Sequence, residues 1–136
     1  MSDAVPDPDP TAAADAVAAL DALVDRWTNL PDIAEALGTD VKKVRGLVAD
    51  RQLVGVRRGE RGVFQVPEAF LVDGEDGTEV LAALRGTVYV LSDAGLSDVE
   101  ILRWLFEPEE SIGVAPVEAL RSGRTHEVRR VAQTLA

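Results

Sequence analysis

The chain has 136 residues, a formal net charge of −10, and 46% hydrophobic and 28% charged residues. This length suits one domain or two small ones, and this balance of apolar and charged residues predicts a folded core. The absence of cysteine excludes disulfides and thiolate metal sites, and no apolar run approaches the roughly 18 residues of a membrane helix. We therefore expect a protein of the reducing cytoplasm that makes no membrane contact.

Residues 1–10 are acidic and rich in proline, and they lack the basic and apolar segments of a signal peptide. They cannot bury enough apolar surface to order themselves, so we predict a disordered acidic tail. Thr11 then opens a predicted helix that runs to about Arg26. The inward stripe of this helix follows a spacing of three or four residues and comprises Ala13, Val17, Leu20, Val24 and Trp27.

Residues 30–50 contain two short amphipathic segments separated by Gly38. The inward positions follow the spacing of a helix and are Ile33, Ala34 and Leu37 in the first segment, then Val41, Val44, Leu47 and Val48 in the second. Gly38 can take the left-handed conformation of a tight turn, and Thr39 or Asp40 can cap the second helix. These features predict a helix-turn-helix, whose second helix enters the major groove of DNA.

Two β-prone runs, residues 53–58 and 63–67, follow the helix-turn-helix and flank a turn bounded by Gly59 and Gly62. Such runs around a glycine-containing turn predict a hairpin. A hairpin directly after a helix-turn-helix is a wing. We therefore expect residues 11–71 to form a winged helix-turn-helix domain that binds double-stranded DNA.

The basic residues of this acidic chain are concentrated in residues 41–61. Salt screens charges beyond about 10 Å, so the local field matters more to a DNA phosphate than the net charge does. The residues expected to contact DNA are Thr39, Lys42, Lys43 and Arg45 on the second helix and Arg57, Arg58 and Arg61 on the wing. Lysine mostly binds phosphate, whereas arginine can also bind guanine through two hydrogen bonds, so Arg45 is the candidate for base recognition. The alternative is that these basic residues are solvated surface charges.

Catalytic and metal-binding patterns are missing from the sequence. His126 is the only histidine, and it lies among arginines without a partner for general-base chemistry. The paired acids Glu75-Asp76 and Glu109-Glu110 lie in predicted loops, where solvated charge is the ordinary interpretation. We therefore expect no enzymatic activity, no cofactor and no metal site.

The remainder of the chain reads as a loop over residues 72–77 and a helical domain over residues 78–136. Its predicted helices span about 78–91, 97–106, 116–121 and 125–135. The motif Ser97-Asp-Val-Glu100 fits a capping box, and Pro116 suits the first turn of a helix. Apolar residues beyond the needs of a winged helix suggest dimerisation or binding of a protein partner, and they are Leu81, Leu84, Val88, Ile101, Leu105 and Leu120. A single hydrophobic core could equally absorb all of them.

Residues 27–71, with the motif Ile33-Ala34-x-x-Leu37-Gly38 and the wing, resemble small actinobacterial winged-helix DNA-binding proteins of the mycobacterial type. They are also similar to the DNA-binding end of MerR-type regulators. The stretch from Leu96 to Gly123, with Pro116-x-x-x-Leu120-x-x-Gly123, is similar to the toxin-binding domain of Xre-type antitoxins. These resemblances imply a mainly α fold with a small β-hairpin wing and a function in transcriptional regulation. The alternative is an antitoxin-like protein-interaction module that does not bind DNA.

Thr11 follows the predicted tail in the sequence Asp7-Pro-Asp-Pro10-Thr11, where a Ser/Thr protein kinase could reach it. A phosphate at this position would meet the positive end of the helix dipole and make the N-terminal arm more acidic. We predict a regulatory phosphorylation site at which the charged arm competes with DNA for the basic wing. The alternative is that Thr11 only caps the first helix.

Overall fold

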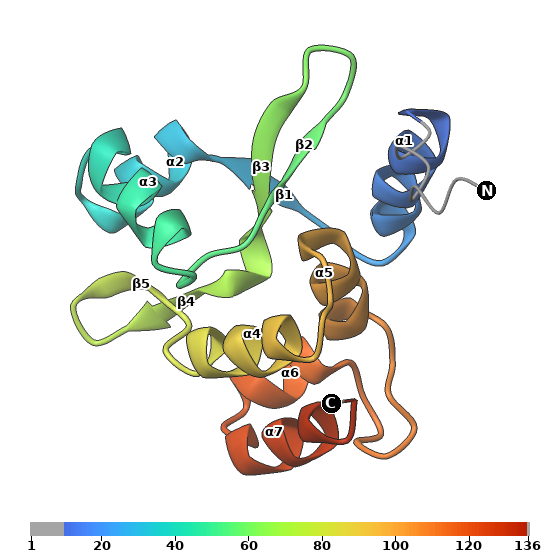
Figure 1. Cartoon of the computed structure of the whole chain (residues 1–136). Helices are drawn as coiled ribbons and strands as arrows, with labels where there is room; N and C mark the ends of the chain where they lie inside the picture. The colour runs from blue at the N-terminus through green and yellow to red at the C-terminus, as the bar shows by residue number, and fades with distance from the viewer. Residues whose placement is uncertain (1–9, 136) are drawn as a thin grey trace.

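The computed structural model describes residues 10–135, with side chains from residue 15 onward. The predicted acidic tail lies outside this range except for Pro10, which begins the first helix. In chain order the first elements are α1 (Pro10–Ala19), η1 (Leu20–Ala22), β1 (Trp27–Asn29), α2 (Leu30–Leu37), α3 (Val41–Ala49), β2 (Val56–Arg58) and β3 (Val63–Pro67). They are followed by η2 (Glu68–Phe70), β4 (Leu71–Gly74), β5 (Gly77–Val80), α4 (Leu84–Asp93), α5 (Asp98–Phe106), α6 (Pro116–Arg121) and α7 (Thr125–Gln133), as Figure 1 shows.

Helices α2 and α3 and the hairpin of β2 and β3 confirm the predicted winged helix-turn-helix. Strands β1, β3 and β2 form an antiparallel sheet in that order. In the hairpin, Arg57 lies opposite Phe64 and Arg58 lies opposite Val63, so the pairing continues up to the turn. The hairpin projects from the body of the molecule as a wing (Figure 1).

The N-terminal helix is shorter than predicted. Helix α1 ends at Ala19, a turn of 3-10 helix continues to Ala22, and the chain then extends into β1. Trp27 therefore lies in the sheet opposite Pro67, and its predicted place on a helical stripe is wrong. Pairing with β3 satisfies the backbone of this segment, whose tryptophan and threonine favour strands. Thr11 lies one residue inside α1 and not at its cap, and its side chain is outside the described residues.

The predicted loop over residues 72–77 is wrong, because this segment belongs to a second hairpin. Strands β4 and β5 pair antiparallel, with Gly74 opposite Gly77. These glycines flank a two-residue turn, and Gly77 has a φ of 120°, which side-chain-bearing residues rarely adopt. The pairing keeps the chain extended through β5, so α4 begins at Leu84 and not at the predicted Thr78.

Helices α5, α6 and α7 confirm the other predicted helices to within two residues at each end. The predicted capping box is present: the backbone N–H of Ser97 donates to Glu100 Oε1 at 2.9 Å, and the backbone N–H of Glu100 donates to Ser97 Oγ at 3.3 Å. Pro116 occupies the first turn of α6, as expected. Within residues 10–135, no helix has the length and apolar character needed to cross a membrane.

One hydrophobic core runs through both halves of the chain. Ile33 and Val44 of the helix-turn-helix are fully buried, and buried Phe70 packs on Phe106 of α5 with 5.6 Å between ring centroids. The apolar residues that suggested a protein partner are all buried in the same core: Leu81, Leu84, Val88, Ile101, Leu105 and Leu120. The chain itself covers these residues, so they give no support to a partner-binding surface.

Candidate nucleic-acid interface

Local hydrogen bonds build the turn between α2 and α3. The Asn29 side chain caps α2 by accepting a backbone hydrogen bond of 2.8 Å. Gly38 ends α2 with a φ of 69°, the left-handed value that the predicted turn requires. Asp40 Oδ1 accepts from the backbone N–H of Lys43 at 2.8 Å, so Asp40 and not Thr39 caps α3.

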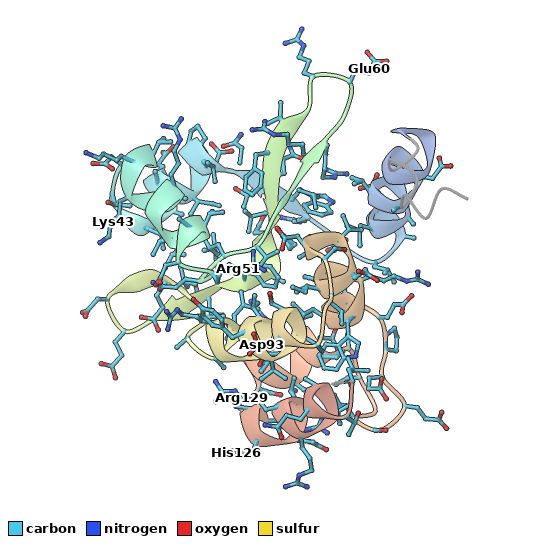
Figure 2. All side chains as sticks on the ribbon, in the orientation of Figure 1. Lys43, Arg51, Glu60, Asp93, His126 and Arg129 are labelled. Atoms are coloured by element: carbon cyan, nitrogen blue, oxygen red, sulfur yellow. The ribbon has the colours of Figure 1, made fainter. Side chains whose placement is uncertain are left out.

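Helix α3 buries one face and presents the other to solvent. Val44 is fully buried, whereas the predicted DNA-contacting residues of this region are all exposed: Thr39, Lys42, Lys43 and Arg45. Lys43 points away from the body of the molecule (Figure 2). Among residues 10–135, no acidic residue forms an ion pair with the three basic residues on this helix. Their charges are therefore available to an external anion.

The wing presents two arginines to solvent. Arg57 and Arg61 are exposed, and Arg57 Nη1 donates to the backbone oxygen of Gly62 at 3.0 Å across the turn. Glu60 lies at the tip beside Arg61 (Figure 2), where its negative charge opposes the positive charge of its neighbour. The tip therefore carries a net positive charge that the acid reduces.

Arg58 differs from the other two predicted wing residues. Side chains alternate along a strand, and the Arg58 guanidinium lies over the Trp27 ring, 4.2 Å from its centroid. The same guanidinium pairs with the Asp21 carboxylate and donates to Gln65 Oε1, and the Arg58 side chain is 20% exposed. The sequence pattern does not indicate these partners, because it predicts Trp27 on a helix. The signal that could have found them is the pair Trp27-Thr28 in β1, because tryptophan and threonine both favour strands.

The C-terminal end of α3 is attached to the second half of the molecule. Arg51 pairs with Asp98 at the start of α5 at 2.9 Å, and Arg85 of α4 pairs with Asp50 at 3.1 Å. A hydrogen bond from Gln52, together with the nearby Arg85, holds the pKa of Asp50 below its ordinary value, so this acid is ionised at neutral pH. Arg51 and Arg85 thus have internal partners, unlike the bases on the exposed face of α3.

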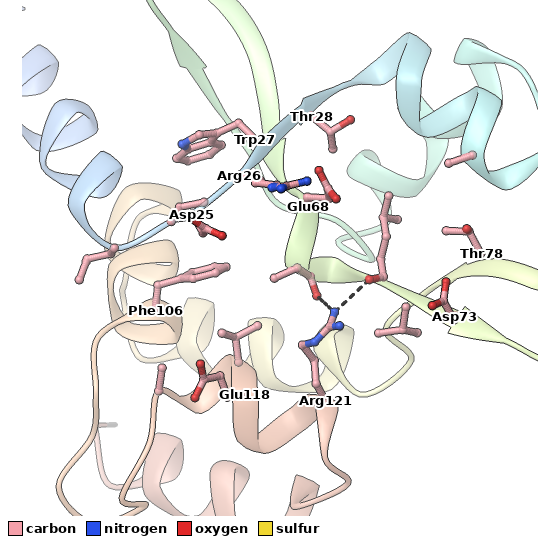
Figure 3. Close-up of a pocket in the computed structure, with 18 of the residues that line it drawn as sticks. Asp25, Arg26, Trp27, Thr28, Glu68, Asp73, Thr78, Phe106, Glu118 and Arg121 are labelled. Atoms are coloured by element: carbon pink, nitrogen blue, oxygen red, sulfur yellow. Dashed lines mark hydrogen bonds between the residues drawn. The ribbon is translucent and has the colours of Figure 1, made fainter.

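A groove lies away from α3 and the wing. This groove, of 770 Å³, lies beside β1 and is closed on the other side by α5 and α6 (Figure 3). Arg121 reaches across it and donates from Nη1 to the backbone oxygens of Ala69 at 2.6 Å and Leu71 at 2.9 Å. Acids and bases both line the groove, and no group of three metal-ligating side chains occurs in the part of the chain that the structure describes. Its mixed charge suits a polyanion less well than the face of α3 and the wing.

An exposed basic helix after a tight turn, beside a basic hairpin, defines a winged helix-turn-helix protein. Residues 12–71 match the family model described as "DNA-binding protein Rv2175c, wHTH domain", and residues 81–136 match "Rv2175c C-terminal domain of unknown function". The chain is 35% identical to the "DNA-binding protein Rv2175c" of Mycobacterium tuberculosis over 120 residues, which cover 79% of this chain and 79% of that protein. The chain belongs to the Rv2175c family.

A solved structure supports the same assignment. The NMR structure of Rv2175c matches with a TM-score of 0.71 at 35% identity, and the match covers 82% of this chain and 81% of that chain. The expected fold class and the resemblance to mycobacterial-type winged-helix proteins are thus confirmed. The similarity of the C-terminal half to Xre-type antitoxins stays a prediction.

Proposed function

We propose that this protein binds double-stranded DNA and regulates transcription, with α3 in the major groove and the wing against the sugar-phosphate backbone. The observation that carries the proposal is a set of exposed basic residues that form no ion pair with an acid among residues 10–135: Lys42, Lys43, Arg45, Arg57 and Arg61. They lie on the two elements with which winged helices contact DNA. The family supports this function, because the relative is named a DNA-binding protein. A non-enzymatic role and a cytoplasmic location are part of the same proposal.

The exposed residues of α3 have different chemistry and are assigned different roles. Lys42 and Lys43 bind phosphates, because an ammonium group is a compact point charge. Arg45 carries a planar guanidinium that can donate two hydrogen bonds to one guanine edge. Thr39 lies just before α3, where a hydroxyl can donate to a phosphate oxygen.

The salt dependence of binding tests this proposal directly. Fluorescence anisotropy of a labelled random duplex of about 30 bp, measured between roughly 50 and 200 mM salt, gives the slope of log K against log salt. Each neutralised phosphate contributes about −0.9 to the slope, so four or five contacts predict a slope of about −4. Lys43→Ala and Arg57→Ala should each reduce its magnitude by about 0.9.

The matched control is Arg130→Ala. It removes the same charge from an exposed position on α7, far from the wing (Figure 1). The slope should then equal that of the wild type. A wild-type protein without salt-dependent binding, or a control variant that loses as much slope as Lys43→Ala, would contradict the proposed interface.

We also propose, on the sequence pattern, that a Ser/Thr kinase modifies Thr11. A phosphate in the first turn of α1, which begins at Pro10, would be stabilised by the helix dipole and would make the arm more acidic. The arm would then compete with DNA for the wing. The test is mass spectrometry after treatment with a kinase from the host, followed by DNA binding of Thr11→Glu and Thr11→Ala. No phosphate at Thr11, or equal affinity of both variants, would end this idea.

The alternative function is a protein-interaction module with a homodimeric or heteromeric contact on the C-terminal helices. The exposed large apolar residues of this half are Tyr89 and Leu135, with exposed fractions of 41% and 43%. Light scattering at high concentration and a pull-down from host extract test this contact. A monomer that binds DNA with the salt dependence given above favours the regulator.

A further inference from the structure

Most of the eleven glycines have a feature within the chain that accompanies the missing side chain. Seven have a positive φ, between 61° and 120°, and they are Gly38, Gly59, Gly62, Gly77, Gly95, Gly113 and Gly123. At Gly55 a Cβ would lie 2.3 Å from the backbone oxygen of Gln65. At Gly74 and Gly86 it would meet the ends of the Glu79 and Arg129 side chains, which lie against these glycines. Gly46 shows neither feature, because its φ is not positive and no atom lies within 4 Å of where its Cβ would stand.

Gly46 lies in the interior of α3, where glycine destabilises a helix relative to alanine more than any residue except proline. Neither turn geometry nor packing inside the protein offsets this cost. Close approach of another molecule to the helix would account for glycine at this position.

The position of Gly46 indicates what approaches. It is exposed, with Lys42 and Lys43 one turn before it and Asp50 one turn after it on the same face of α3. A hollow of 510 Å³ surrounds it, and the other residues of its lining are Asp40, Leu47 and Gln52. Gly46 thus lies at the centre of the face that the proposed function directs toward DNA.

The chemistry of the hollow distinguishes a base edge from a phosphate. In the interior of a helix the backbone N–H groups are already bonded within the helix, so they cannot bind a phosphate. The lining of the hollow includes Gly46 and the half-buried Leu47, and such a surface suits the apolar part of a base edge, such as a thymine methyl group. The two lysines in the same lining can bind the flanking phosphates.

We propose that Gly46 is a specificity-determining residue, whose missing side chain lets base-pair edges in the major groove contact the backbone of α3. This inference rests on the proposed DNA-binding function. Any side chain at position 46 keeps the helix farther from the bases. The loss of sequence-specific affinity therefore grows with the size of the substituent, while the stability of the protein rises on substitution by alanine.

The test begins with selection of a preferred duplex from a random library of about 20 bp by the wild-type protein. Gly46→Ala should raise the melting temperature by a few degrees, because alanine favours the helix. It should lower the affinity for the selected duplex about tenfold and leave the affinity for a shuffled duplex within about twofold. Gly46→Gln should lose more affinity for the selected duplex than Gly46→Ala. Ser92→Ala, at an exposed position of α4, also favours a helix and should change neither affinity.

Each other outcome has a defined meaning. Gly46→Ala with unchanged affinity for the selected duplex overturns the inference and leaves DNA binding intact. Equal losses on both duplexes show that the glycine admits the phosphate backbone, which also overturns base recognition at this position. A wild-type protein that binds DNA but selects no sequence also overturns base recognition by Gly46. Only a wild-type protein that binds no DNA overturns the proposed function together with the inference.

Discussion

Arg58→Ala should weaken the fold and leave the salt dependence of DNA binding unchanged. The Arg58 guanidinium lies 4.2 Å from the Trp27 ring centroid, and a largely desolvated cation–π contact contributes about 1–2 kcal/mol. The ion pair with Asp21 adds only about 0.5 kcal/mol, since the aspartate side chain is 53% exposed. The free energy of unfolding should therefore fall by about 2 kcal/mol.

Urea unfolding and DNA anisotropy on the same variants separate the two roles of arginine on the wing. Asp21→Ala should lose about 0.5 kcal/mol, because it removes the ion pair and keeps the cation–π contact. Arg57→Ala is the matched control from the opposite face of the same strand, and it should lose about 0.9 of salt slope with little change in stability. The reasoning is refuted if Arg58→Ala loses about 0.9 of slope and keeps its free energy of unfolding. Arg58 would then be the phosphate contact that the sequence analysis predicted.

Three further predictions concern single positions. Gly38→Ala should lower the free energy of unfolding in urea by about 1–2 kcal/mol, because Gly38 has a φ of 69°; Gly46→Ala should change it in the opposite direction. Glu60→Gln should raise DNA affinity about twofold at low salt and have no effect at high salt, since it removes a screened negative charge from the wing tip. Hydrogen bonds from the backbone and side chain of Ser97 hold the pKa of Glu100 below its ordinary value of 4.5. The stability that ionised Glu100 contributes is therefore present above pH 4.5 and is lost as the pH falls through the lowered pKa of the folded state. Glu100→Ala should therefore narrow the difference between the free energies of unfolding at neutral pH and at about pH 3, measured by urea titration.

Features specified by neighbouring residues could be predicted from the sequence. The helix-turn-helix depends on the left-handed Gly38, on a cap at Asp40 and on apolar residues at helical spacing, all within residues 30–50. The capping box of α5 likewise joins residues three positions apart. Such signals are read correctly because their partners lie within one or two helical turns.

Features specified by distant residues could not be predicted in the same way. Strand β1 exists because it pairs with β3, almost forty residues later in the chain, and no local pattern names that partner. The misplacement of Trp27 then concealed the environment of Arg58. The sequence predicts a loop where β4 and β5 form a hairpin, because the turn is acidic and rich in glycine. Two glycines around a two-residue turn also suit a hairpin.

The orientation of α3 depends on contacts with helices α4 and α5, which lie outside the winged helix. Arg51 follows α3 with a φ of 64°, in a left-handed conformation that disfavours a side chain by about 1 kcal/mol. Its guanidinium pairs with Asp98 of α5, and Arg85 of α4 donates to both the backbone oxygen and the carboxylate of Asp50. A glycine at position 51 would relieve the backbone but would lose the ion pair to α5. The strained arginine thus has a function in joining the two halves, and the C-terminal half helps to fix the helix that we propose to enter the major groove.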